Sequence, residues 1–151
     1  MHLRSAGEPD AVAVSEVWRS SIRTICAPAY RFDESVLVPW ADSKTPECVS
    51  ELIRCEEFFV VAEEFSKICG FFCATFELGS FALYVAPECQ GQGIGSRLFR
   101  CYENLARASD RKVLSFHSTL NAVTFYQKLG AVISGEPLSK PRPCIPMRKE
   151  L

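Results

Sequence analysis

The spacing of apolar residues changes along the chain, and each kind of spacing predicts a different element. Apolar residues recur every three or four positions across Pro9–Ile25, which predicts an amphipathic helix that begins at a proline. Two shorter helices are expected at Asp33–Ala41 and at Pro46–Cys55, the second capped by the hydroxyl of Thr45. The first third of the chain is therefore expected to be rich in helix.

The middle of the chain is dense in Phe and Val, and its spacing no longer fits a helix. Breaks near Phe65–Lys67 and Glu77–Ser80 divide the stretch from Glu56 to Glu88 into three segments of β-forming residues. We expect three strands joined by tight turns, with the opening residues HLRSA as a further edge strand.

Beyond a glycine-rich segment, helical spacing returns over Ser96–Ser109 and strands alternate with helices. The pattern predicts a strand at RKVLSFH, a helix at TLNAVTFYQKLG that ends at Gly130, and a closing strand pair at AVISGE and CIPMRKE. No repeat or linker interrupts the 151 residues, so one mixed α/β domain over residues 1–151 is expected.

Composition excludes several classes of protein. The net charge of -1, without a cluster of Lys and Arg, argues against nucleic-acid binding. No apolar run reaches the roughly 18 residues of a membrane span, and the N-terminus lacks the apolar core of a secretory signal. Eight cysteines occur without a CxxC pair and with only two histidines, which favours reduced thiols over a metal site. A cytoplasmic protein without metal or membrane is expected.

Three glycines stand at alternating positions in PECQGQGIGSRLF, at Gly91, Gly93 and Gly95, directly before a predicted helix. The start of a helix presents free N–H groups to an anion, and glycine lets a phosphate approach the backbone. A Walker loop is excluded because Gly-Lys-Ser/Thr is absent. A dinucleotide-binding fingerprint does not fit, because the third glycine comes one position early and the next strand ends without an acid.

The pattern V-x-P-x-x-Q-G-x-G-x-G, from Val85 to Gly95, resembles the acyl-CoA-binding motif of the GNAT superfamily of N-acetyltransferases. The second signature of that superfamily is matched by AVTFYQKLGA, and the opening VWRSSIRTICAPAY resembles a bacterial subgroup of it. Two departures stand out: Ala131 replaces a frequent Phe, and Thr119 replaces a frequent Asn, with Asn121 out of register.

The resemblance implies a GNAT-type fold, with a central, mostly antiparallel, splayed mixed sheet flanked by helices. It also implies that backbone N–H groups of Gln90–Gly95 bind the pyrophosphate of acetyl-CoA and that the strand Leu83–Val85 contacts the pantetheine arm. The residues so assigned to acetyl-CoA are Leu83, Tyr84, Val85, Gln90, Gly91, Gln92, Gly93, Ile94, Gly95, Ser96, Thr119, Ala122, Phe125 and Tyr126.

Acetyl transfer to an amine needs an oxyanion site, a proton for the departing thiolate and a neutral amine. Backbone N–H groups near Tyr84 and Val85 are candidate oxyanion donors, and Tyr126 matches the general-acid tyrosine of the superfamily, with core packing as its alternative role. His117 and Glu77 are candidate bases, with a chain of waters as the third possibility.

The function expected from this resemblance is transfer of an acetyl group from acetyl-CoA to a primary amine in a ternary complex, by a monomer or homodimer. The alternative is an acyl-CoA-binding sensor domain without catalysis. Acceptor specificity should come from CAPAYRFDES and from the last strand pair, neither of which identifies the acceptor.

Overall fold

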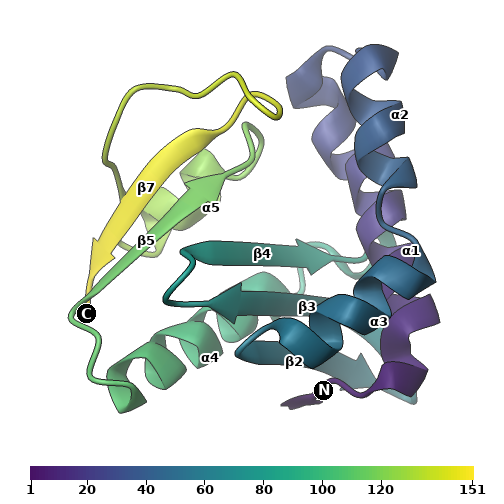
Figure 1. Cartoon of the computed structure of the whole chain (residues 1–151), viewed down its shortest axis with the longest axis horizontal. Coiled ribbons are helices and arrows are strands. Elements are labelled where there is room, and N and C mark those ends of the chain that lie inside the picture. Colours follow the sequence, from purple (N-terminus) through teal and green to yellow (C-terminus); the bar gives the residue numbers. More distant parts are fainter.

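Four antiparallel strands form the first sheet of the computed structural model, which describes residues 1–151 (Figure 1). The strands lie in the order β1-β2-β3-β4, and their bounds are β1 His2–Ser5, β2 Phe58–Glu64, β3 Lys67–Thr75 and β4 Ser80–Val85. The edge strand and the meander predicted from the sequence are confirmed. Strand β3 is buried over nearly its whole length because helices cover both faces of the sheet.

A second, smaller sheet of antiparallel strands has the order β5-β7-β6. Its strands are β5 Val113–Ser118, β6 Val132–Ile133 and β7 Ile145–Glu150. Strands β4 and β5 lie near one another but form no ladder of hydrogen bonds, so the two sheets separate at this point. The expected splayed and mostly antiparallel sheet is thus present, and every strand pairing in it is antiparallel.

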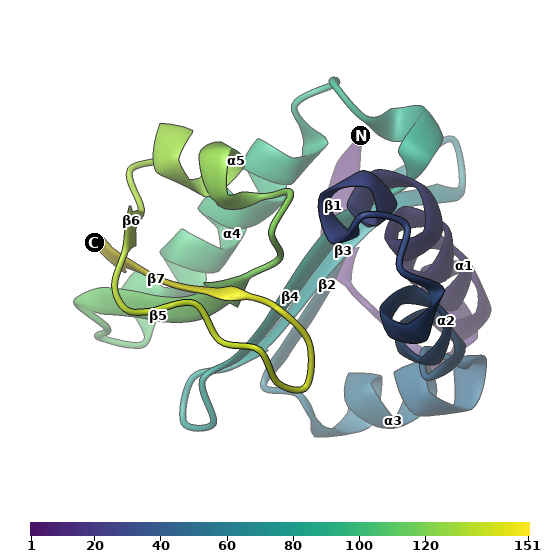
Figure 2. The same cartoon turned by 90° about the horizontal axis from the view of Figure 1, so that it is seen from above.

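The helices divide between the two faces of the first sheet. Helix α4 packs on one face, and α1 and α3 pack on the other (Figure 2). The bounds of the helices are α1 Ala11–Ser21, α2 Glu34–Asp42, α3 Pro46–Cys55, α4 Ile94–Ala108 and α5 Val123–Lys128. No helix is long and apolar enough to span a bilayer.

Local capping explains where the two short helices begin. The Asp33 carboxylate accepts a hydrogen bond from the Ser35 N–H at 3.0 Å, and the Thr45 hydroxyl accepts one from the Cys48 N–H at 3.1 Å. Each bond satisfies an amide that has no partner within its helix. Both helices lie within one residue of the predicted bounds.

The long first helix that the sequence predicts is continued in altered geometry. After α1, the chain passes through a π-helical turn at Ile22–Cys26 and a 3₁₀ turn at Ala27–Tyr30. Pro28 cannot donate the hydrogen bond that a regular helix would need there, which fits the 3₁₀ turn and the break that the sequence predicts at CAPAYRF. The altered turns place Ile25 and Cys26 beside the end of β4.

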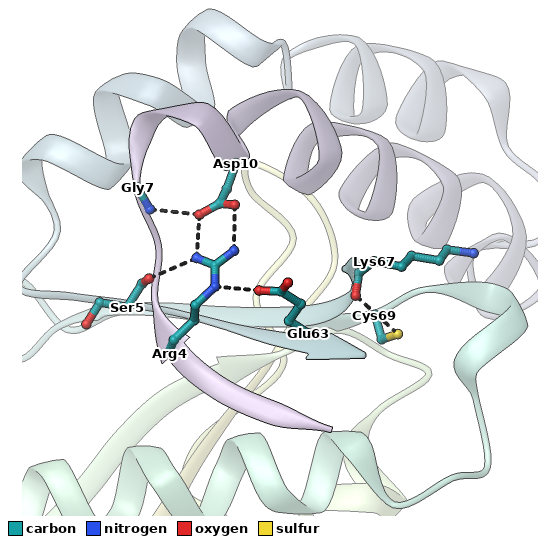
Figure 3. Close-up of polar contacts among 7 residues, drawn as sticks. All are labelled: Arg4, Ser5, Gly7, Asp10, Glu63, Lys67 and Cys69. Atoms are coloured by element: carbon teal, nitrogen blue, oxygen red, sulfur yellow. Dashed lines mark hydrogen bonds and ion pairs between the residues drawn. The ribbon is translucent and has the colours of Figure 1, made fainter. Parts of the chain in front are cut away.

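A network of ion pairs joins the N-terminal strand to the start of the first helix (Figure 3). Both terminal nitrogens of Arg4 donate to the Asp10 carboxylate at 2.8 Å, and its Nε donates to Glu63 on β2 at 2.5 Å. The hydrogen bonds from Arg4 to Asp10 lower the pKa of that carboxyl group. The network fixes the β1–α1 connection against the sheet.

Candidate active site

The glycine segment forms an open loop that leads into α4. Gly91 and Gly93 have positive φ values of 75° and 76°, and a Cβ built at either position has no heavy atom within 4 Å. A side chain would therefore strain the backbone and project into free space next to the first N–H groups of the helix. This geometry suits a bound anion in contact with the main chain.

Gly95 is required for a different reason. A Cβ at this position would lie 3.2 Å from the ring of Phe125 on α5, so glycine allows α4 and α5 to pack closely. Gly91 and Gly93 thus allow the backbone a positive φ, whereas Gly95 allows a close contact between two helices. The sequence pattern does not separate these two roles.

Strand β4 has one edge without a neighbouring strand. The Ala86 N–H donates to the Cys69 carbonyl at 2.8 Å. Because the direction of the backbone groups alternates along a strand, Tyr84 and Ala82 also direct their N–H and C=O groups toward β3. The intervening residues Leu83 and Val85 direct theirs toward the open edge. The free N–H that the sequence places near Tyr84 and Val85 therefore belongs to Val85, because the backbone of Tyr84 faces β3.

Two side chains hold the Val85 carbonyl at the end of this edge. The Ser21 hydroxyl on α1 donates to it at 2.9 Å, and the Gln90 side-chain amide donates to it at 2.8 Å. Gln90 thereby ties the start of the glycine loop to β4. The loop and the strand edge are consequently fixed relative to one another.

A cavity of about 340 Å³ lies between the glycine loop, the open edge of β4 and α5. Ten of its eighteen lining residues are hydrophobic, and none is Asp, Glu, Lys, Arg or His. Those expected from the sequence are Leu83, Tyr84, Val85, Gln90, Gly91, Gly93, Ile94, Gly95, Ser96, Thr119, Ala122, Phe125 and Tyr126, and those not expected are Ser21, Ile25, Cys26, Cys89 and Asn121.

Tyr126 reaches this cavity from within an aromatic cluster. Its ring packs against Phe116 at 4.8 Å and Phe99 at 5.3 Å between ring centroids, and 4% of the residue is exposed. Burial raises the pKa of Tyr126, so the phenol keeps its proton throughout the neutral range. The Tyr126 side chain is therefore part of the core and also lines the cavity.

Three residues proposed from the sequence do not line the cavity. Glu77 lies in the β3–β4 turn, where its exposed carboxylate pairs with Arg111 at 2.9 Å. His117 is exposed on β5, on the strand face opposite to buried Phe116. The Gln92 amide lies 3.5 Å from the Glu88 carbonyl and is exposed. The structure does not bring either candidate base to the cavity.

Two cysteines form part of the cavity wall, and their thiols are held neutral. Burial raises the pKa of Cys26 to about 12 and that of Cys89 to about 11. All eight cysteines of the chain are free. Near neutral pH the cavity therefore contains no ionised side chain.

A second hollow, of about 540 Å³, lies between α1 and the β2–β3 turn and contains several carboxylates. Asp10 and Glu63 are paired with Arg4 (Figure 3), and Glu88 is paired with Lys67 at 2.6 Å. Its charged groups thus largely satisfy one another, in contrast to the uncharged cavity at the glycine loop. Nowhere in the chain do three or more His, Cys, Asp or Glu side chains gather in a way that could hold a metal ion.

Comparison with known proteins agrees with this geometry. A GNAT-family protein from Rhodopseudomonas palustris is 23% identical, with a TM-score of 0.88 over 99% of this chain and 95% of that one. PaiA N-acetyltransferase from Thermoplasma acidophilum, solved in complex with coenzyme A, is 18% identical, with a TM-score of 0.81 over 99% and 98%. Ribosomal-protein-alanine N-acetyltransferase from Brucella melitensis is 19% identical, with a TM-score of 0.75 over the full length of both chains.

These structural similarities concern the fold. No match was found among curated protein sequences. The family model of the acetyltransferase (GNAT) domain matches residues 55–130, which include the glycine loop, the open edge of β4 and Tyr126. The chain therefore belongs to the GNAT family of acetyltransferases.

Proposed function

We propose that this protein transfers an acetyl group from acetyl-CoA to a primary amine by direct attack. The observation that carries the proposal is that the glycine loop, the free edge of β4 and Tyr126 all line one cavity. The coenzyme A complex of the Thermoplasma relative supports the same cofactor here. The pyrophosphate would contact the amides of Gly91 and Gly93, and the pantetheine arm would follow Leu83 and Val85.

In the proposed reaction the amine nitrogen bonds to the carbonyl carbon of the thioester, and the C–S bond then breaks. The N–H of Val85, which the register of β4 directs toward the open edge, is the candidate donor to the oxyanion. Tyr126 would give its proton to the departing sulfur and regain one from the attacking amine, so that the net transfer runs from nitrogen to sulfur. Its raised pKa keeps the phenol protonated before the reaction and makes transfer to sulfur uphill on its own, so the amine must return a proton to Tyr126 in the same step.

The amine should reach the thioester already neutral, because no carboxylate or histidine lines the cavity. The amine would lose its proton to water before it binds, so that the protein would not need a side chain as general base. The same observation favours the second candidate function, an acyl-CoA-binding domain that does not catalyse transfer.

Release of free CoA thiol distinguishes the two functions. The protein is incubated with acetyl-CoA and a mixture of primary amines at several pH values, and thiol release is compared with and without amines. Amine-dependent release, with an acetylated amine identified by mass spectrometry, supports the transferase. CoA binding without release at any pH would assign the chain to the sensor class, and absence of CoA binding would refute both functions.

A further inference from the structure

Two cations on the α2 side of β4 differ from every other Lys and Arg in the chain. Lys44, between α2 and α3, and Arg142, in the β6–β7 loop, are half-buried and form no salt bridge with a carboxylate. All other Lys and Arg side chains are either paired with a carboxylate or exposed to solvent. A half-buried cation without a partner is costly to keep.

Both cations are held in place by aromatic rings. Lys44 Nζ lies 4.4 Å from the centre of the Trp18 ring, and the Arg142 guanidinium carbon lies 4.2 Å from that of Trp40. Trp18 in turn packs at 5.5 Å on Tyr84, which lines the cavity. Only the Trp18 ring therefore lies between Lys44 and the Tyr84 side of the cavity wall.

The two charges act on one another and on the cavity wall. Burial, and next the charge of Arg142, lower the pKa of Lys44. The positive charge of Arg142 also counteracts the burial that raises the pKa of Cys26 and Tyr84, both of which line the cavity. Lys44 and Arg142 thus form one positively charged region that acts on two residues of the cavity wall, although neither cation lines the cavity itself.

The loop that carries Arg142 is tied to the turn that follows the first helix. The Tyr30 hydroxyl donates to the Pro143 carbonyl at 2.6 Å and accepts from the Leu120 N–H at 3.3 Å. Figure 2 shows the β6–β7 loop reaching toward α2, on the other side of β4 from α4. Buried Trp40 on α2 adds an indole N–H that has no acceptor in the chain. The ring that carries Arg142 therefore also holds an unpaired donor, and the loop above it is tied down by Tyr30.

We infer that Lys44 and Arg142 bind an anionic group of the acceptor, so that the preferred acceptor is an amine that also carries a carboxylate or a phosphate. An anion would supply the partner that both cations lack, and the uncharged cavity would receive the amine. Polycationic amines would be repelled by the same potential. This inference rests on the proposed acetyl transfer and specifies its substrate class.

Matched acceptors test the inference by turnover. Phenylalanine is compared with phenylalaninamide, phosphoethanolamine with ethanolamine, and spermidine serves as the polycation. Phenylalaninamide has a less basic amine than phenylalanine, so a larger fraction of it is neutral near pH 7. It should therefore react faster than phenylalanine if the protein did not recognise the carboxylate. We expect kcat/KM to be at least about tenfold higher for the anionic member of one pair, the size of one charge-assisted contact. The pair that shows the preference distinguishes carboxylate from phosphate.

Variants assign the preference to these two side chains. Lys44→Gln and Arg142→Gln should each lower kcat/KM for the anionic acceptor about 10- to 100-fold through KM, and change the neutral acceptor little. Lys140→Gln, an exposed cation in the same loop as Arg142, is the matched control. If the cations only held the loop on the tryptophan rings, the variants would lower Tm and leave the ratio between paired acceptors unchanged.

A second measurement does not depend on turnover. The protein is first saturated with CoA, so that the pyrophosphate site is filled, and is then titrated with inorganic phosphate or succinate while Tm is recorded. An anion should raise Tm in the wild type and in Lys140→Gln, but not in the Lys44→Gln, Arg142→Gln double variant. No rise, or an equal rise in the double variant, would overturn the inference. Failure of CoA itself to raise Tm would instead refute the proposed function.

Discussion

At the open edge of β4 the cavity is lined by backbone and by neutral side chains, whereas on the α2 side of Tyr84 two cations lie unpaired on tryptophan rings. The first region is built from one continuous segment, Gln90–Ser96, together with the neighbouring strand and helix. The second brings together residues almost 100 positions apart, Lys44 and Arg142. A local backbone site leaves a sequence motif, and an assembled side-chain site does not.

The largest expected effect concerns Tyr126 at the cavity. Tyr126→Phe removes the proton donor but keeps the ring, so kcat should fall about 10²- to 10⁴-fold with CoA affinity retained. Steady-state kinetics and CoA titration measure the two quantities.

The control is Tyr102→Phe, because Tyr102 belongs to the same buried aromatic cluster but does not line the cavity. Its kcat should stay close to that of the wild type. An unchanged kcat in Tyr126→Phe, or an equal loss in both variants, would assign Tyr126 to packing.

Thiol labelling tests whether the cavity is as neutral as the structure indicates. At pH 8 a thiol whose pKa is raised from 9.0 to about 11 has about 100-fold less thiolate, so Cys89 should react with iodoacetamide far more slowly than exposed Cys55. Cys26, with a pKa of about 12, should react more slowly still. Mass spectrometry of the ligand-free protein measures each site, and rapid labelling of Cys26 or Cys89 would contradict a neutral cavity.

A smaller effect is expected at the link between the glycine loop and β4. Gln90→Ala removes the hydrogen bond to the Val85 carbonyl, which contributes about 0.5–1.5 kcal/mol to holding the loop. The Kd for CoA should rise by up to about tenfold. Gln92→Ala is the matched control, because the Gln92 amide makes only a 3.5 Å contact to Glu88. Equal effects of the two variants would show that the loop is not held through Gln90.

Much of the fold follows from local sequence pattern. The caps at Asp33 and Thr45 define helix starts within one residue, and the breaks near Phe65 and Gly79 define the strand turns. Those features depend on residues a few positions apart. The sequence predicts regular helix as far as Ile25 and a break at CAPAYRF. The π-helical turn from Ile22 is not predicted, because five residues are too few for the spacing of apolar side chains to distinguish it from an α-helix.

The candidate site is predictable only in part. The glycine motif identifies the loop, and the Tyr126 helix follows at the expected distance. The sequence correctly predicts that His117 lies at the end of β5. Because buried Leu114 and Phe116 alternate with it along the strand, its side chain lies on the opposite, exposed face. Glu77 lies in the turn that leads into β4, as the sequence predicts, but this turn is at the end of the strand remote from Val85. Ser21 and Cys26 reach the cavity through tertiary packing of α1 and its continuation, for which no motif exists.

The central claim is that the backbone of the glycine loop binds coenzyme A, and thermal unfolding of two glycine variants tests it most directly. Gly93 and Gly79 both have positive φ and free space around a Cβ, but Gly79 lies in the β3–β4 turn, outside the cavity. Gly93→Val and Gly79→Val should therefore lose similar stability, about 1–2 kcal/mol, from backbone strain alone.

Only the ligand should separate these variants. With CoA at 100 times its Kd, the wild type and Gly79→Val should gain about 2.7 kcal/mol, while Gly93→Val gains nothing, and NAD or ATP should stabilise none of them. Equal stabilisation of Gly93→Val by CoA, or stabilisation of the wild type by NAD or ATP but not by CoA, would contradict the account.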